Sequence, residues 1–173
     1  MPIQPFIFVG VGGTGGKTLG VVRKMLDDTL ARIGWEEDWP DGWQFVHIDV
    51  PADPDANTSD TPYGLPRTSY VPLTTNRSTY QGYHDAISRE LAQATADSAE
   101  RYLAWGSWHP EPASAVKVQI PNGAGQYRTI GRVCLLKSLR QVEQSLARAF
   151  ESVTSAEAGP QLRRVQELIG IDR

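Results

Sequence analysis

Along the first fifty residues, two short apolar runs flank a stretch in which apolar positions recur with a helical period. Residues 5–9 form a short, almost wholly apolar run between a proline and a glycine, which predicts a buried β-strand. Residues 44–50 form a second such run. Between them, apolar residues recur every three or four positions from Leu19 to Ile33, which predicts an amphipathic helix that ends at Gly34. This strand–helix–strand unit predicts two parallel strands joined by a right-handed crossover.

The remaining pattern predicts further helices and few strands. Helical spacing recurs from Tyr83 to Leu103, over one long helix from Val133 to Val153, and from Leu162 to Ile169. Residues 51–79 are rich in Pro, Asp, Thr and Ser, which predicts a long irregular loop, and residues 115–120 resemble a short strand. Strands that alternate with helices predict an α/β fold, a three-layer Rossmann-like parallel sheet flanked by helices.

Length and composition narrow the class of protein. The chain has 173 residues, which suits one domain over residues 1–173. A net charge of -3 argues against a general nucleic-acid binder. Because no apolar run approaches the ~20 residues that cross a bilayer and the start lacks a basic, uninterrupted signal segment, we expect no membrane span and no signal peptide. The single cysteine, Cys134, is expected to be a buried thiol, and a reducing cytoplasm is the expected location.

Two residue types add little candidate chemistry. Three tryptophans in one short segment, Trp35, Trp39 and Trp43, are expected to pack as a loop against the core. The three histidines have no spacing typical of metal ligands, and His47 is expected to be a packed strand residue.

The strongest candidate chemistry lies at the end of the first strand. Glycines let backbone N–H groups approach a phosphate closely, and a helix N-terminus adds partial positive charge. The order of strand, glycine turn and helix therefore predicts a nucleotide phosphate site. Its candidate residues are Gly10, Gly12, Gly13, Thr14, Gly15, Gly16 and Lys17. Asp49 ends the second strand, at the edge of a parallel sheet where ligands bind.

Other families of site share part of this glycine pattern. A P-loop needs a glycine five positions before Gly16, where this chain has Val11. A dinucleotide-binding site of the NAD(P) or FAD type needs G-x-G-x-x-G, which is present, and an acid about 20 residues farther on, whereas Asp49 is more distant. Dinucleotide binding stays an alternative, as does a scaffold or interaction module that keeps the fold without binding a nucleotide. Lys17 fits either a phosphate contact or a solvated first turn.

A second glycine loop provides a further interpretation. Gly123-Ala-Gly125 is followed by Gly131-Arg132 and a long helical pattern. Together with GVGGTGGKT after the first strand and with the strand end His47-Ile-Asp49, this loop resembles the tubulin/FtsZ superfamily, and in particular its bacterial tubulin-like members. The family's GGGTGTG-like loop, its long central helix and the loop that supplies catalytic acids are absent.

This resemblance implies a site for GTP or GDP with Mg²⁺. It implies that Gly10 to Lys17 hold the α- and β-phosphates, that Asp49 orients Mg²⁺ through water, and that Gly123, Ala124 and Gly125 face the γ-phosphate. Arg132, with Arg128, would steady phosphate charge. The base stays open between guanine and adenine.

The resemblance also implies what the chain does alone and in assemblies. The residue that activates water for phosphoanhydride hydrolysis would come from an adjoining subunit or a further segment. No catalytic residue is therefore assigned, and the isolated chain is expected to be nearly inactive. The chain is expected to be the N-terminal portion of the nucleotide-binding domain and to self-associate into filaments or a larger assembly.

Overall fold

The computed structural model describes residues 2–55, 64–93, 109–110 and 112–170. The chain forms two compact units. The first comprises Met1–Ile48, Asp55–Val71 and Gln141–Arg173, and the second comprises Asp49–Pro54 and Pro72–Arg140.

A three-stranded sheet forms the centre of the first unit. Its strands are β1 (Phe6–Val11), β2 (Trp43–Asp49) and β3 (Tyr70–Pro72), in the order β1-β2-β3. β1 and β2 run parallel, which confirms the predicted strand–helix–strand unit and the α/β class. β3 lies within the stretch that the sequence predicts to be irregular, because a strand of three residues is too short to show a period.

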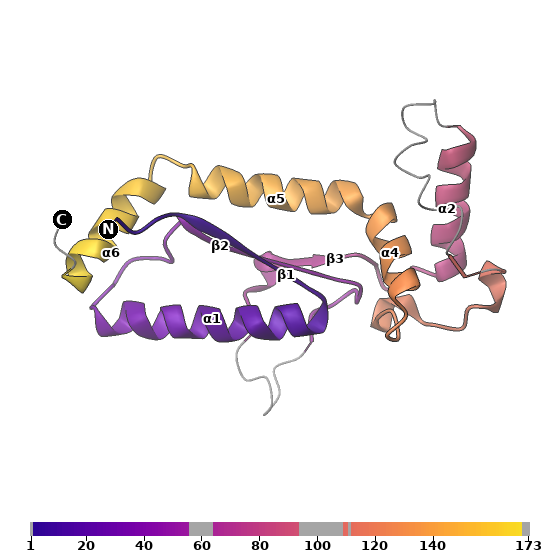
Figure 1. Ribbon diagram of the computed structural model, residues 1–173, viewed down its shortest axis with the longest axis horizontal. Helices are drawn as coiled ribbons and strands as arrows, with labels where there is room; N and C mark the ends of the chain where they lie inside the picture. The colour runs from indigo at the N-terminus through magenta and orange to yellow at the C-terminus, as the bar shows by residue number, and fades with distance from the viewer. Residues whose placement is uncertain (1, 56–63, 94–108, 111, 171–173) are drawn as a thin grey trace. The chain divides into compact units, whose positions relative to one another are not determined.

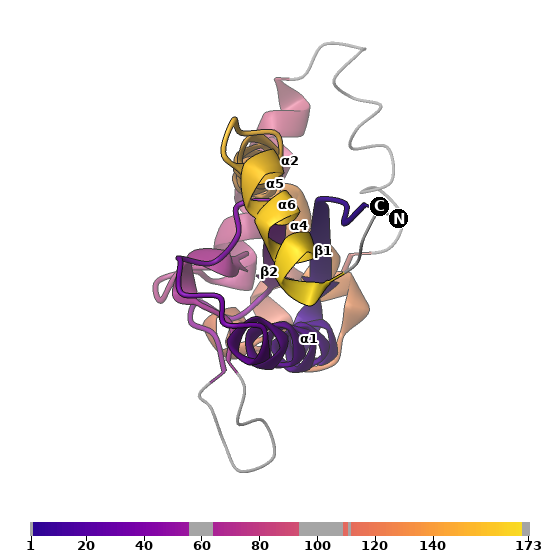
Figure 2. The same cartoon turned by 90° about the vertical axis from the view of Figure 1, so that its left-hand side faces the viewer.

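Helices cover both faces of this sheet. α1 (Gly12–Arg32) lies along one face and α5 (Leu139–Val153) along the other, as Figures 1 and 2 show. Core side chains that are at most 7% exposed come from all three layers: Leu19, Leu30, Phe45, Val46, Ile48, Val71, Val142 and Ala149. α1 ends as predicted, because Gly34 takes a φ of +74° beyond its last turn.

The three tryptophans pack against the core, as the sequence predicts, although Trp43 belongs to β2 rather than to a loop. Trp43 is buried in a cluster with Leu30 of α1 and with Leu162 of α6 (Ala158–Ile169). The indole N–H of Trp39 donates to the carbonyl O of Trp43 (2.6 Å), and the guanidinium of Arg23 lies 3.4 Å from the Trp39 ring centroid.

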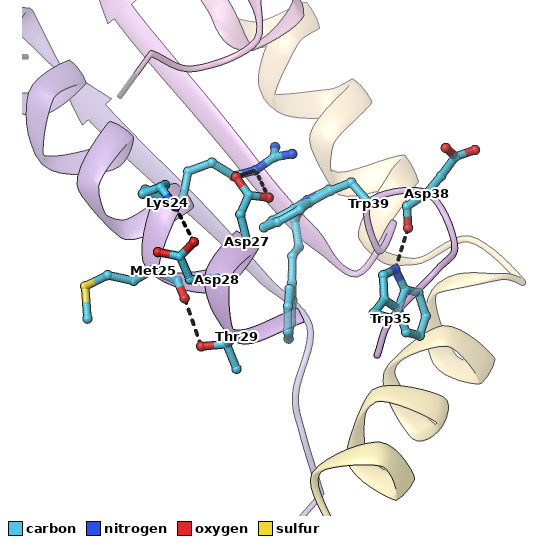
Figure 3. Close-up of polar contacts among 10 residues, drawn as sticks. Lys24, Met25, Asp27, Asp28, Thr29, Trp35, Asp38 and Trp39 are labelled. Atoms are coloured by element: carbon cyan, nitrogen blue, oxygen red, sulfur yellow. Dashed lines mark hydrogen bonds and ion pairs between the residues drawn. The ribbon is translucent and has the colours of Figure 1, made fainter. Parts of the chain in front are cut away.

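The outer surface of α1 carries locally paired polar side chains beside two exposed apolar ones, Val21 and Met25. Lys24 pairs with Asp28 one turn later, and the Thr29 hydroxyl donates to the carbonyl O of Met25 (2.8 Å) (Figure 3). Pairs of this kind on an exposed helix face contribute a few tenths of a kcal/mol each, about 0.2–0.5. The α1 surface away from the sheet is therefore solvated, as the sequence period indicates.

β1 is more exposed than its apolar sequence predicts. Phe8, Val9 and Val11 are 40%, 47% and 69% exposed, so the prediction of a buried strand over residues 5–9 is wrong for the side chains of Phe8 and Val9. The reason is topological, because β1 forms an edge of the described sheet and only β2 pairs with it there. Apolar strands of parallel sheets are usually covered on both sides.

The second unit is mainly helical. α2 (Tyr80–Ala92) packs against α4 (Arg128–Lys137), and a core of side chains at most 2% exposed joins them: Tyr80, Ile87, Ile120, Ile130, Val133 and Cys134. The predicted continuation of α2 to Leu103 falls on residues 94–103, outside the described part of the chain. No helix of the described residues has the length and apolar character needed to cross a bilayer.

Two predictions for the second unit are wrong. Residues 115–120 form no strand; the 3₁₀ turns η3 (Ala113–Ala115) and η4 (Ile120–Asn122) flank this stretch, and the prolines that precede or enter them cannot donate to a sheet. The helix predicted over residues 133–153 is two helices, α4 and α5, which meet at Ser138. The Ser138 hydroxyl donates to the carbonyl O of Leu73 (2.8 Å), so a polar contact with a residue distant in sequence lies at the break between the two helices.

Candidate functional site

The first glycine loop becomes the first turn of α1. The helix begins at Gly12, inside the glycine run, and Gly12 has a φ of +72°, which favours glycine. Val11 at the N-cap offers no side-chain hydrogen bond, and the first turn contains no acidic residue. The N–H groups of Gly12, Gly13 and Thr14 therefore lack intrahelical acceptors, at the end of the helix that carries partial positive charge.

Two glycines of the loop are required by close backbone packing. A Cβ on Gly10 would lie 2.7 Å from the carbonyl O of Gly15, and a Cβ on Gly15 would lie 2.8 Å from the carbonyl C of Gly10. Both distances are too short for real Cβ contacts. These glycines let the end of β1 cross the start of α1 in direct contact, which is a structural requirement.

A third glycine makes room for a histidine. A Cβ on Gly16 would lie 2.5 Å from Nε2 of His47, which reaches the helix from β2. The same Nε2 lies 3.1 Å from the carbonyl O of Gly12. Because a carbonyl only accepts, this nitrogen carries the proton and donates it. His47 is therefore packed, as predicted, and the object it packs against is the glycine loop.

Gly13 differs from its neighbours. The nearest atom to a Cβ built there is Oδ2 of Asp55, at 3.9 Å, and its φ is not positive. Gly13 is therefore required neither by packing nor by backbone conformation. Asp55 is exposed, and sequence reasoning missed it, because its segment shows no period and its only signal is a position six residues after the second strand.

Asp49 ends β2, as predicted, and lies in the second unit. Its Oδ1 accepts a hydrogen bond from the backbone N–H of Val50 (2.7 Å), and its carbonyl O accepts one from the N–H of Leu73 (2.8 Å). Both contacts hold the strand end, and the contact with Val50 involves Oδ1 of the carboxylate.

The second glycine loop lies against the segment that follows Asp49. The N–H of Ala52 donates to the carbonyl O of Pro121 (2.9 Å), and a Cβ on Gly123 would lie 3.9 Å from Pro51. Gly123 and Gly125 have φ values of 125° and 58°. The structure therefore brings the segment directly after Asp49 and the second glycine loop together.

α4 begins directly after this loop. Its N-cap makes no side-chain hydrogen bond, its first residue is Arg128, and its first turn contains no acidic residue. Arg132 lies one turn farther along the helix and is exposed. Each glycine loop thus leads into a helix N-terminus that suits an anion.

The candidate residues fall in two groups. The first unit holds the loop from Gly10 to Lys17, with Thr14 and Lys17 exposed, together with His47 and Asp55. The second unit holds Asp49, the second loop and Arg132. That both groups serve one nucleotide stays a prediction.

Histidine and cysteine side chains also lie outside the glycine loops. The rings of His84 and His109 lie 4.8 Å apart, a proximity that their separation in sequence hides. Among the described residues, no three His, Cys, Asp or Glu side chains gather as a metal site would require. Cys134 is a buried free thiol, as predicted, and burial raises its pKa to about 12. It is therefore neutral near pH 7 and unsuited to nucleophilic chemistry.

Comparison with known proteins identifies the family. Searches of curated proteins and of solved structures found no match to the chain. A family model described as tubulin-like matches residues 7–171, which includes both glycine loops and the end of β2. The chain belongs to the tubulin-like family.

Proposed function

We propose that the chain binds a purine nucleotide, GTP or GDP, through the loop from Gly10 to Lys17. The observation that carries the proposal is the uncapped first turn of α1, which starts inside the glycine run and contains no acid. An anion held there by several N–H groups gains both hydrogen bonds and the favourable end of the helix dipole. Membership of the tubulin-like family supports a nucleotide rather than a simple anion.

Gly13 gives this proposal a specific anchor. Its neighbours Gly10, Gly15 and Gly16 are explained by packing, and Gly12 by its positive φ. A glycine with open space above it in the first turn of a helix carries a penalty of up to about 1 kcal/mol relative to alanine. A phosphate that approaches the Gly13 N–H closely would explain why that penalty is tolerated.

Mg²⁺ would be oriented by carboxylates beside the phosphates. Asp49 is the acid implied by resemblance, and Asp55 is the acid whose Oδ2 lies nearest to the space above Gly13. Mg²⁺ commonly binds to one or two carboxylates together with substrate phosphates and water. Lys17, exposed in the second turn of α1, would add a positive point charge.

The second loop would face the γ-phosphate. Gly123, Ala124 and Gly125 precede the uncapped start of α4, and Arg128 and Arg132 supply positive charge. Phosphoryl transfer to water depends mainly on positioning and charge stabilisation, together with a residue that orients the water. We propose that this residue comes from a partner subunit, so that the isolated chain binds GTP and turns it over very slowly.

We also propose that the chain associates with further copies of itself. Within the described residues only β2 pairs with β1, which exposes Phe8, Val9 and Val11, and an apolar strand at a sheet edge is a surface for strand pairing. Sedimentation velocity should show association that increases with concentration. Val9→Lys should abolish it, whereas Leu168→Lys, a control at an exposed apolar position of α6, should not. A monomer at every concentration would contradict this proposal.

Calorimetry tests the proposed ligand. The chain is titrated with GTP, GDP, ATP and NAD, each with and without Mg²⁺. Binding of GTP and GDP, tighter with Mg²⁺, is the expected result. Binding of NAD alone would instead favour a dinucleotide site, and no binding of any of the four would favour a scaffold.

A further inference from the structure

We propose that His47 is a positioning residue that sets the direction of the Gly13 N–H group in the phosphate loop. This proposal rests on the proposed function and adds a residue that the glycine motif does not contain. His47 projects from β2 onto the first turn of α1, where its Nε2–H donates to the carbonyl O of Gly12 (3.1 Å).

The geometry of the peptide bond connects this contact to the ligand. In a trans peptide the C=O and the following N–H point in opposite directions. A hydrogen bond that holds the Gly12 C=O toward the body of the helix therefore holds the Gly13 N–H outward, beyond the helix N-terminus. This N–H is one of those without an intrahelical acceptor.

The surroundings hold the imidazole in place. Its ring lies edge-on to the ring of Tyr70 from β3, with centroids 5.1 Å apart. On the helix side it occupies the space that a side chain at Gly16 would need, since a Cβ there would lie 2.5 Å from Nε2. Gly16 and His47 thus act together: the missing side chain at Gly16 leaves space for the imidazole, and the imidazole restrains the first turn of α1.

The contact matters more here than in an ordinary helix start. Glycine residues lose more conformational freedom on folding than any others, and this loop contains five of them in seven positions. The first turn also lacks a side-chain cap. The His47 bond is therefore the side-chain hydrogen bond that restrains the Gly12–Gly13 peptide among the contacts the structure describes.

Three variants separate a hydrogen-bonding role from a packing role. His47→Leu keeps comparable volume without a donor, and His47→Gln keeps an N–H donor at a similar reach. Gln44→Leu is the control, because residue 44 lies on the same strand with its side chain toward the opposite face. The Kd for GDP with Mg²⁺ should rise about tenfold in His47→Leu, the loss expected for one hydrogen bond of about 1.4 kcal/mol. It should stay within about threefold of wild type in His47→Gln and in Gln44→Leu. An equal loss in His47→Leu and His47→Gln, or no loss in either, would overturn the proposal.

A double-mutant cycle tests the link between Gly16 and His47. Gly16→Ala should displace the imidazole and weaken GDP binding as much as His47→Leu does. In a His47→Ala background the added methyl meets no ring, so Gly16→Ala should change the Kd by less than about twofold. Additive losses of GDP affinity would contradict the proposed coupling between Gly16 and His47.

The positioning claim can also be tested without a nucleotide. Both replacements remove the ring current of the imidazole, so the readout in ¹H–¹⁵N spectra is the line width of the Gly12 and Gly13 amide signals. These signals should stay narrow in His47→Gln and broaden in His47→Leu. The His47 ring should show a protonated Nε2. If wild type binds no nucleotide, the proposed function fails, while these spectra still decide whether His47 orients the loop; equally narrow amide signals in wild type, His47→Gln and His47→Leu would refute it.

Discussion

Gly13 and Gly15 are separated by one residue, yet the structure assigns them different requirements. A methyl at Gly15 would lie 2.8 Å from the carbonyl C of Gly10, where neither backbone can move without separating β1 from α1. A methyl at Gly13 would meet nothing closer than 3.9 Å. Replacing each with alanine therefore distinguishes a glycine needed for packing from one needed for a ligand.

The expected changes in the free energy of unfolding differ in sign between the two variants. Gly15→Ala should lower the free energy of unfolding by about 1–3 kcal/mol, the usual range for overpacking, with the upper end expected because the clash is with backbone. Gly13→Ala should leave it unchanged or raise it by up to about 1 kcal/mol, because alanine favours a helix more than glycine does. If the Gly13 N–H contacts a phosphate, the added methyl should also weaken GDP binding by at least about tenfold, or 1.4 kcal/mol.

Two assays on the same samples decide the matter. Urea unfolding followed by tryptophan fluorescence gives the stability, and calorimetry with GDP and Mg²⁺ gives the Kd. A Gly15→Ala variant as stable as wild type, or a Gly13→Ala variant that loses as much stability as Gly15→Ala, would contradict the different packing of the two glycines. Wild-type affinity in Gly13→Ala would remove the proposed ligand contact and leave the packing argument intact.

Three further predictions follow from the described contacts. Asp55→Asn should bind GDP more tightly than wild type without Mg²⁺, because a negative charge beside the phosphates is gone, and about tenfold more weakly with Mg²⁺. Calorimetry measures both affinities, and Asp49→Asn is the parallel variant. An unchanged effect of Mg²⁺ on GDP affinity in both variants would refute the metal site. Burial raises the pKa of Cys134 from 9.0 to about 12, so the stability contributed by its neutral thiol is complete below pH 9 and is lost as pH rises from 9 toward 12, by about 1.4 kcal/mol per pH unit. The urea midpoint of Cys134→Ala should therefore decline less steeply than that of wild type over this pH range. Parallel declines in the two proteins would contradict the raised pKa. Arg23→Ala should lower the free energy of unfolding by about 1 kcal/mol through the lost stacking on Trp39, and an unchanged urea midpoint would contradict this contact.

The sequence predicts those parts of the fold that a period or a special residue marks. Short apolar runs mark β1 and β2, a period of 3.6 residues marks α1, and Gly34 ends the helix through a conformation that glycine favours. β3 has three residues and no period. The break at Ser138 depends on a contact with Leu73, 65 positions away, which a local pattern cannot reveal.

In the candidate site, too, a local pattern reveals some features, and others depend on contacts between distant residues. The glycine loop is visible in sequence because its residue types are rare and closely spaced. The separate role of each glycine is not visible, because it depends on which atoms lie opposite: Gly10 and Gly15 face each other, and Gly16 faces His47. His47 and Asp55 come from segments 30 or more positions away along the chain, so only the folded structure reveals that they lie beside the loop.

A ¹H–¹⁵N titration of the uniformly labelled chain with GDP and Mg²⁺ observes the loop amides themselves and so tests whether the α1 N-terminus binds a phosphate. The amide signals of Gly12, Gly13 and Thr14 should shift most, in a saturable manner and with one common Kd. Binding that leaves these three amides unmoved, or no binding at concentrations well above those of cellular nucleotides, would contradict the assignment of the α1 N-terminus as a phosphate site.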